Sequence, residues 1–357
     1  MKAAPVLRAL EKRPAISQSL VHTGQHYDAN MSDVFFTELG IPTPNYNLNV
    51  GSGSHARQTA EIMTRFEPIV LELKPDIVFA YGDVNSTVAA ALVAAKLGVR
   101  VGHVEAGLRS FDWSMPEEIN RVVTDRLADF LFTPSEDGDL NLMHEGVPAE
   151  KIYRVGNVMI DSLIRLLPAA MKLPKNGLPD RYALVTLHRP SNVDNCETLG
   201  RIFRALLEVS KEMAVVFPVH PRTRRRLMDA GLNVDALHLL DPLPYVEFLA
   251  LQQRAAVVIT DSGGIQEETT YLGVPCLTLR NNTERPVTVN LGTNVLVEVA
   301  NGSLARELSK IIAGSAKKGT IPPLWDGHAG ERIADVLERC IAGCKFAESA
   351  SYHELLS

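Results

Sequence analysis

The chain has 357 residues, which is long for a single hydrophobic core and predicts two domains. Its 36 Lys and Arg against 42 Asp and Glu give a net charge of −6, which argues against nonspecific binding of nucleic acid. No apolar run approaches the roughly 18 residues that a membrane span needs, so we expect no membrane partner. The first 14 residues contain no apolar signal segment, and this predicts a cytoplasmic protein. The four cysteines follow no disulfide pattern, and we expect reduced thiols at Cys196, Cys276, Cys340 and Cys344.

The first half of the chain contains a strand–helix–strand pattern. Residues 76–83 form a short apolar run that ends in Gly-Asp, residues 85–98 are Ala-rich and stop at a glycine, and residues 99–105 are apolar again. This order predicts two parallel strands joined by a helix, with both faces of the sheet buried.

The second half repeats the alternation. We expect strands at residues 182–188, 214–220, 256–261 and 274–280, and helices at 196–211, at 246–255 and from 262–264 onward. Residues 166–181 are rich in Pro, Lys and Gly and predict a linker, with the hinge just before it near 155–163. The predicted fold is therefore α/β, with two Rossmann-like doubly wound domains over residues 1–158 and 159–357. Whether the last helix returns to the first domain stays open. The default ligand site in such a fold is the cleft between the domains.

Acidic residues gather where the strands of the first domain end. Asp83 and Glu105 each follow a strand, and Glu117 and Glu118 lie at a helix start in the segment MPEEINR. Helix capping would explain Asp83, Glu117 and Glu118 equally well, and His103 could be a core histidine. Three acids at adjacent strand ends are costly unless they act on a ligand or pair with Arg109 and Arg121. Paired carboxylates with separated pKa values are what proton abstraction and delivery require.

The second domain carries a different pattern, in TDSGGIQEE. Ser262, Gly263 and Gly264 place backbone N–H groups at a helix start, which is a ready phosphate site. Glu268 lies further along the same helix, where its carboxylate could accept hydrogen bonds from a ribose diol. A Gly-rich turn followed by a solvated acidic face remains the alternative explanation.

Basic side chains follow other strands of the second domain. These are His188, Arg189, His220, Arg222, Arg280 and Arg285. Together with the Gly-rich helix start they favour a diphosphate site, since no HExxH motif, no Cys/His cluster and no Walker loop is present. A nucleotide diphosphate in the second domain and acids in the first already suggest an enzyme that acts on a nucleotide sugar.

The chain resembles the non-hydrolysing UDP-N-acetylglucosamine 2-epimerases, which have the two-domain GT-B fold. The resemblance covers nearly the whole chain and rests on eleven segments in the family's order: TGQHYD, YGDVNST, GHVEAGLRS, MPEEINR, VGNVMIDSL, TLHRP, PVHPR, TDSGGIQEE, LGVPCLTLR, TERP and GTNVLV.

The resemblance implies a reaction and assigns residues to it. UDP is eliminated across C1–C2 as the C2 proton leaves, giving 2-acetamidoglucal, and UDP adds back after a proton returns to the opposite face. The family's catalytic positions fall on Asp83, Glu105, Glu117 and His188, with the separate roles of the three acids left open. Its UDP contacts fall on Ser262, Gly263, Gly264, Glu268, Arg285 and Phe248. Sugar-binding or allosteric positions fall on Gln25, His26, His220 and Arg109. The resemblance implies no metal and no cofactor, and a homodimer that makes UDP-ManNAc for polysaccharide synthesis.

Two departures from the family qualify these expectations. The family begins with a strand and a GTRPE loop, whereas this chain begins inside the following helix, so we expect a first domain without its first strand. Tyr27 and Asp28 stand where many bacterial members carry Arg and a longer polar residue, so allosteric activation does not carry over. The alternatives are a 2-epimerase for a modified UDP-GlcNAc, a hydrolysing 2-epimerase, a retaining glycosyltransferase, and an inactive UDP-sugar binder.

Overall fold

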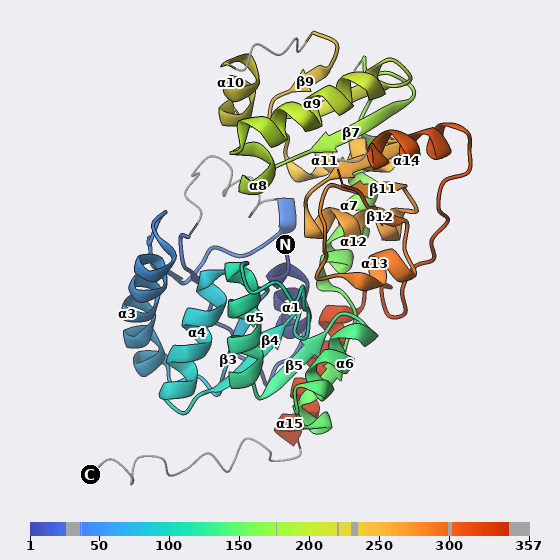
Figure 1. Cartoon of the computed structure of the whole chain (residues 1–357). Helices are drawn as coiled ribbons and strands as arrows, with labels where there is room; N and C mark the ends of the chain where they lie inside the picture. Colours follow the sequence, from blue (N-terminus) through green and yellow to red (C-terminus); the bar gives the residue numbers. More distant parts are fainter. Residues whose placement is uncertain are drawn as a thin grey trace. The chain divides into compact units, whose positions relative to one another are not determined.

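The computed structural model describes residues 1–25, 36, 38–175, 177–219, 221–229, 235–298 and 302–342. The chain divides into two compact units: Met1–Ser162 together with the chain from Pro323 onward, and Leu163–Pro322. Each unit is an α/β body built on a parallel sheet, and Figure 1 shows the elements of both. No helix in the described part of the chain is long and apolar enough to cross a membrane.

Unit 1 is built on a four-stranded parallel sheet with the order β3-β4-β5-β6. Two further strands, β1 and β2, pair with each other in parallel as a separate two-stranded sheet. The strands are β1 (Val21–His22), β2 (Tyr46–Asn47), β3 (Ile77–Tyr81), β4 (Arg100–Val104), β5 (Phe130–Thr133) and β6 (Ile152–Arg154). Short β-branched and aromatic runs form these strands, as residues buried on both faces of a parallel sheet should.

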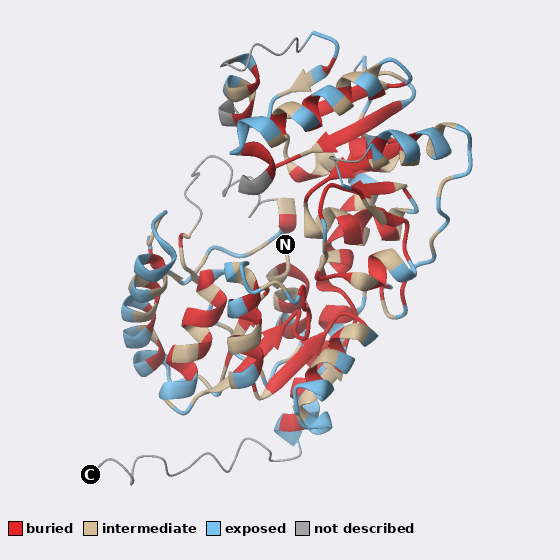
Figure 2. Cartoon of the chain, viewed as in Figure 1, coloured by how far each residue is buried: buried red, intermediate tan, exposed pale blue. Residues whose placement is uncertain are grey.

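Helices cover both faces of the unit 1 sheet. They are α1 (Ala3–Glu11), α3 (His55–Leu73), α4 (Asn85–Lys96), α5 (Pro116–Leu127), α6 (Glu136–His144), the 3₁₀ turn η1 (Ala149–Lys151) and α15 (Ala329–Ala342). On one face, Val6 and Leu10 of α1 share a core with Ile333 and Leu337 of α15. On the other face, side chains of α3, α4 and α6 pack in a second core, and Figure 2 shows β5 as buried. The last described helix therefore belongs to unit 1.

Unit 2 contains a six-stranded parallel sheet with the order β12-β11-β10-β7-β8-β9. The strands are β7 (Tyr182–Thr186), β8 (Ala214–Pro218), β9 (His238–Leu240), β10 (Val257–Thr260), β11 (Cys276–Thr278) and β12 (Asn294–Leu296). The central strands β7 and β10 pair from Ala183–Val257 to Thr186–Thr260, so their carboxyl ends are level. Residues that follow these two strands therefore emerge at one edge of the sheet.

The helices of unit 2 also form two layers. They are α8 (Pro190–Val193), α9 (Cys196–Ser210), α10 (Pro221–Asp229), α11 (Tyr245–Arg254), α12 (Gly263–Leu272), α13 (Pro286–Asn290) and α14 (Ser303–Ile312). Phe203 and Leu206 of α9 pack in one core with Leu304 and Leu308 of α14. Leu251 of α11 packs in the core on the opposite face. The prediction of α/β architecture with two Rossmann-like domains is confirmed.

The predicted linker over residues 166–181 is wrong in its first part. Helix α7 (Val158–Lys172) continues through Leu166 and contains Pro168. Leu166 and Ala170 are buried, so packing of this helix outweighs the unfavourable proline. The irregular connection is confined to the residues between α7 and β7, and the boundary between the units falls inside α7, after Ser162.

Candidate active site

Two of the predicted acids follow neighbouring strands of the unit 1 sheet. Tyr81 of β3 pairs with Val104 of β4, so Asp83 and Glu105 emerge side by side at the carboxyl edge. Glu117 lies in the first turn of α5, which follows the same edge. The structure thus places Asp83 and Glu105 at one edge of one sheet, and Glu117 in the helix that follows β4.

Asp83 does not cap a helix; it is held by an arginine. Helix α4 begins at Asn85 with Val84 as its N-cap and no side-chain cap. Arg121 NH1 donates to Asp83 Oδ2 at 2.5 Å, and Asn120 Nδ2 donates to the Asp83 carbonyl at 2.9 Å. The alternative explanation of Asp83 as a helix cap is therefore wrong, and its carboxylate has a fixed orientation instead.

The carboxylate of Glu118 binds the loop that precedes α5 and does not cap the helix. Its carboxylate accepts from the backbone N–H groups of Ser110 and Phe111, at 2.8–3.1 Å, and from the guanidinium of Arg121 at 2.6 Å. Burial alone would raise the pKa of Glu118, but these donors outweigh it and lower the pKa. Glu118 thereby connects the 110–111 loop to the arginine that holds Asp83.

Glu105 adopts an unusual backbone conformation in a buried setting. Its φ is +76°, in the left-handed region that an L side chain rarely adopts, and the residue is buried. Lys2 Nζ forms an ion pair with Glu105 Oε2 at 2.6 Å. Strain of this kind collects at functional sites, where the surrounding structure holds the residue in place. Lys2 was not predicted as a site residue, because a lysine at position 2 carries no motif signal.

Arg109 does not face open space; it belongs to a buried network. Its guanidinium binds both oxygens of Glu145 at 2.7 Å and Asp125 Oδ2 at 2.7 Å. Asp125 also faces His103. Arg109 therefore pairs with Asp125 and Glu145 rather than with the strand-end acids, and its contact with a sugar stays a prediction.

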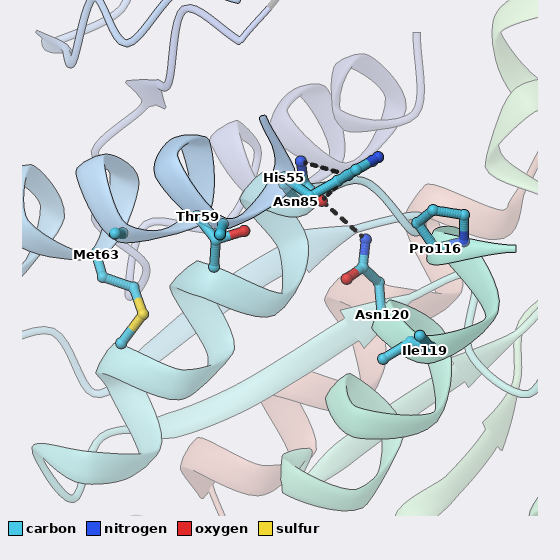
Figure 3. Close-up of a pocket in the computed structure, with 9 residues that line it drawn as sticks. His55, Thr59, Met63, Asn85, Pro116, Ile119 and Asn120 are labelled. Carbon is cyan, nitrogen blue, oxygen red and sulfur yellow. Dashed lines mark hydrogen bonds between the residues drawn. The ribbon is translucent and has the colours of Figure 1, made fainter. Parts of the chain in front are cut away.

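An open groove of about 390 Å³ lies beside the acid edge, between α3 and α5 (Figure 3). Its polar end contains His55, Asn85 and Asn120, while Met63, Pro116 and Ile119 supply apolar walls. Asn85 Nδ2 donates to Gln58 Oε1 at 2.7 Å, and Asn120 Nδ2 lies 3.3 Å from Asn85 Oδ1. This chain of amides ends at the Asp83 carbonyl.

Gln25, one of the predicted sugar or allosteric residues, contacts the start of α4. Its Oε1 accepts from Ser86 N at 3.1 Å and Ser86 Oγ at 2.7 Å. His26 and His220 lie outside the described residues, as do Tyr27 and Asp28.

In unit 2, the predicted phosphate site, here called the phosphate cradle, is the N-terminus of helix α12. Ser262 is its N-cap, and Gly263 and Gly264 form the first turn with free backbone N–H groups of the kind that bind anions. A Cβ at Gly263 would collide with the Arg285 guanidinium, so Arg285 covers the helix start. A Glu284 carboxylate oxygen lies at the same point, so the helix start faces an Arg285–Glu284 pair.

Acids hold the arginines of this cradle. Arg280 binds Glu284 at 2.7 Å, and Arg285 binds Glu267 at 2.9 Å and also contacts Glu284. Burial would raise the pKa of Glu284, but the two arginines lower it far below its ordinary value. Glu284 and Glu267 were not predicted, although both stand inside the motifs TERP and SGGIQEE.

His188 follows β7 and pairs with an aspartate that follows β10. Its Nδ1 lies 3.0 Å from Asp261 Oδ1, and its side chain is 61% exposed. Asp261 also accepts from the backbone N–H of His188 and Arg189. Burial would raise the pKa of Asp261, but the contact with His188 and its other donors lower it. An ionised Asp261 holds Nδ1 and leaves Nε2 for a ligand.

Glu268 is buried in α12 beside a tyrosine of α11. Tyr245 donates its hydroxyl to Glu268 Oε1 at 2.9 Å, while Oε2 has no hydrogen-bond partner in the described chain. Burial raises the pKa of Glu268 to about 7. An unpaired buried carboxylate oxygen suits a ligand hydroxyl. Phe248 lies one turn after Tyr245 and packs against the core that contains Leu251.

Among the described residues, no group of three His, Cys, Asp or Glu side chains could hold a metal ion. Cys344 lies outside them, and Cys196, Cys276 and Cys340 are free thiols.

Residues 8–338 match the family described as UDP-N-acetylglucosamine 2-epimerase. The chain belongs to this family. A UDP-N-acetylglucosamine 2-epimerase of Methanocaldococcus jannaschii is 43% identical over 351 residues, covering 94% of this chain and 95% of that protein. A UDP-2,3-diacetamido-2,3-dideoxy-D-glucuronate 2-epimerase of Pseudomonas aeruginosa is 42% identical over 342 residues, covering 95% of this chain and 96% of that protein.

A solved structure gives the same result. The M. jannaschii UDP-GlcNAc 2-epimerase in complex with UDP-GlcNAc and UDP superposes with a TM-score of 0.88 at 43% identity, over 95% of this chain and 96% of that one. The recognised family and its GT-B class of fold are thereby confirmed.

Proposed function

We propose that the chain catalyses the reversible epimerisation of UDP-N-acetylglucosamine at C2. The observation that carries the proposal is the set of acids at one sheet edge of unit 1, where Arg121 fixes Asp83 at 2.5 Å and Lys2 pairs with Glu105 at 2.6 Å. Membership of the 2-epimerase family over residues 8–338 supports the same activity.

In this proposal, unit 1 supplies the proton transfers. One carboxylate among Asp83, Glu105 and Glu117 removes the C2 proton as the C1–O bond to UDP breaks, which leaves 2-acetamidoglucal. Another acid returns a proton to the opposite face of C2, and the UDP oxygen then re-forms the bond to C1. Electrons and atoms balance without a redox step, because UDP is both the leaving group and the returning nucleophile.

Unit 2 binds the UDP part of the substrate. The N–H groups of Gly263 and Gly264 and the guanidinium of Arg285 would stabilise the diphosphate as it leaves, while the N–H of Ser262 donates to Thr260 Oγ1 at 3.0 Å. Glu268 would accept hydrogen bonds from the ribose hydroxyls through its unpaired oxygen. His188, oriented by Asp261, would donate from Nε2 to the departing phosphate. The backbone near Phe248 would contact the uracil.

Solvent exchange at C2 tests this activity. The purified chain is incubated with UDP-GlcNAc in heavy water and followed by proton NMR. We expect UDP-ManNAc to appear with deuterium at C2. No exchange together with intact UDP binding would instead favour an inactive UDP-sugar binder, and free ManNAc would favour a hydrolysing enzyme.

The relative from Pseudomonas raises a second sugar as an alternative substrate. Its substrate, by its name, is a UDP-2,3-diacetamido-2,3-dideoxy-glucuronate, and its identity of 42% is close to the 43% of the UDP-GlcNAc enzyme. Offering both nucleotide sugars in one heavy-water reaction decides between them, since the preferred sugar acquires deuterium first.

Assembly and setting are also part of the proposal. We propose a cytoplasmic homodimer that supplies UDP-ManNAc for polysaccharide synthesis, supported by the family resemblance alone. Light scattering of the purified chain tests the dimer, and a monomeric mass at working concentration would contradict it.

A further inference from the structure

His103 of β4 lies between two acceptor groups in the interior of unit 1. The residue is 0% exposed. Its Nε2 is 2.8 Å from the carbonyl oxygen of Gly82, and its Nδ1 is 2.5 Å from Asp125 Oδ1. A carbonyl oxygen only accepts hydrogen bonds, so Nε2 must carry a hydrogen.

The other ring nitrogen contacts Asp125, which two further donors hold in place. Asp125 Oδ2 accepts from Arg109 Nη1 at 2.7 Å and from the N–H of Gly107 at 3.1 Å. Burial would raise the pKa of Asp125, but the neighbouring His103 and Arg109 lower it below its ordinary value. His103 therefore links the Gly82 carbonyl to a carboxylate whose orientation is fixed.

Arg109 extends this network to a second carboxylate. Its guanidinium binds Asp125 at 2.7 Å and Glu145 at 2.7 Å. Buried charges persist when they are paired and hydrogen-bonded, and removing one partner leaves an uncompensated charge. The network is therefore a rigid unit rather than a set of independent contacts.

This network holds both turns that carry the candidate acids. Gly82, whose carbonyl His103 binds, directly precedes Asp83. Gly107, whose N–H Asp125 binds, follows Glu105 by two residues. We propose that His103 is a positioning residue that fixes the Asp83 turn relative to the Glu105 turn through Asp125. This inference rests on the proposed epimerase function, because it concerns the orientation of those acids.

The first test compares His103→Gln with His144→Gln, a control on the exposed surface of α6. Glutamine can replace one hydrogen bond of His103 but not both. For His103→Gln we expect kcat of C2 deuterium incorporation to fall roughly tenfold or more, with KM changed less than about threefold. UDP affinity, measured by calorimetry, should stay unchanged in both variants. An unaltered kcat with only a lower melting temperature would overturn the positioning role.

A second variant covers the case that His103→Gln does not fold. Asp125→Glu keeps the charge but moves the carboxylate by one methylene, and it should lower kcat in the same manner. An Asp125→Glu variant with wild-type kcat would again overturn the positioning role.

The control reactions separate the two proposals. If the wild-type chain exchanges no deuterium, the proposed function fails and the positioning role fails with it. If the wild type is active and His103→Gln is equally active, only the positioning role is lost.

Discussion

The guanidinium of Arg121 joins the carboxylate of Asp83 to that of Glu118. Its NH1 is 2.5 Å from Asp83 Oδ2, and its NH2 is 2.6 Å from Glu118 Oε2. Because Glu118 also binds the N–H groups of Ser110 and Phe111, one side chain connects a candidate catalytic acid to the loop in front of α5. Replacing this fork by a single ammonium group should uncouple the two carboxylates.

Arg121→Lys should slow C2 deuterium exchange by roughly 10- to 100-fold, because lysine can satisfy only one of the two carboxylates. We expect a loss of roughly 1–3 kcal/mol in unfolding free energy from the carboxylate left unpaired. Arg126→Lys, on the exposed face of the same helix, is the matched control and should behave as the wild type. Equal exchange rates for the two variants would show that Asp83 does not depend on Arg121.

Glu268→Gln should stabilise unit 2 at alkaline pH while weakening UDP binding. Burial raises the pKa of Glu268 from 4.5 to about 7. Between these values the folded chain holds a proton that the unfolded chain releases, so stability falls as pH rises toward 7 and then stays low. At pH 8 the buried charge costs roughly 1–3 kcal/mol, which the neutral glutamine avoids.

Urea unfolding at pH 5 and pH 8 measures this effect. The gain from Glu268→Gln should be larger at pH 8, whereas Glu247→Gln, an exposed site on α11, should show no such difference. Calorimetry should also show UDP binding weakened by roughly 1–3 kcal/mol, since a ribose hydroxyl loses its carboxylate acceptor. A stability gain without loss of UDP affinity would remove Glu268 from the nucleotide site.

The positions of the strands could be predicted from the sequence because their signals are local. Residues 182–188 and 256–261 are apolar, β-branched runs, and the structure has strands Tyr182–Thr186 and Val257–Thr260 there. The prediction of a linker from residue 166 was wrong because Pro168 is a strong local signal against a helix. The burial of Leu166 and Ala170, which stabilises the helix, becomes visible only in the folded unit.

In the candidate site, too, only the features with a local sequence signal could be predicted. That Asp83 and Glu105 emerge at one sheet edge follows from strand order, which the sequence reveals. Arg121 was expected as a partner for these acids and does pair with Asp83, but Lys2, the partner of Glu105, carries no signal because it is far from Glu105 in the chain. Tyr245 was missed for a related reason: a tyrosine at a helix start has no motif value until the fold brings it to Glu268.

Asp161→Ala should loosen the start of α15. The carboxylate of Asp161 accepts from Ala329 N at 3.2 Å and Gly330 N at 2.8 Å, which satisfies two free N–H groups at that helix start. Losing a cap of this type costs roughly 1–2 kcal/mol of unfolding free energy. Denaturant titration should detect the loss, and Asp180→Ala, an exposed aspartate in unit 2, serves as control. Equal denaturant concentrations at the unfolding midpoint for the two variants would contradict the capping role of Asp161.

The positive φ of Glu105 predicts an unusual order of stability between two small replacements. Both Glu105→Ala and Glu105→Gly remove the ion pair with Lys2, and both should abolish most C2 exchange. Only alanine retains the cost of a side chain at φ +76°. Glycine should therefore be the more stable variant by about 1 kcal/mol, the reverse of the order in ordinary strand or helix positions. Thermal unfolding of the pair measures the difference directly, because the lost contacts are shared. If alanine proved more stable, the left-handed conformation of Glu105 would not persist in solution, and the strain assigned to this acid would have to be given up.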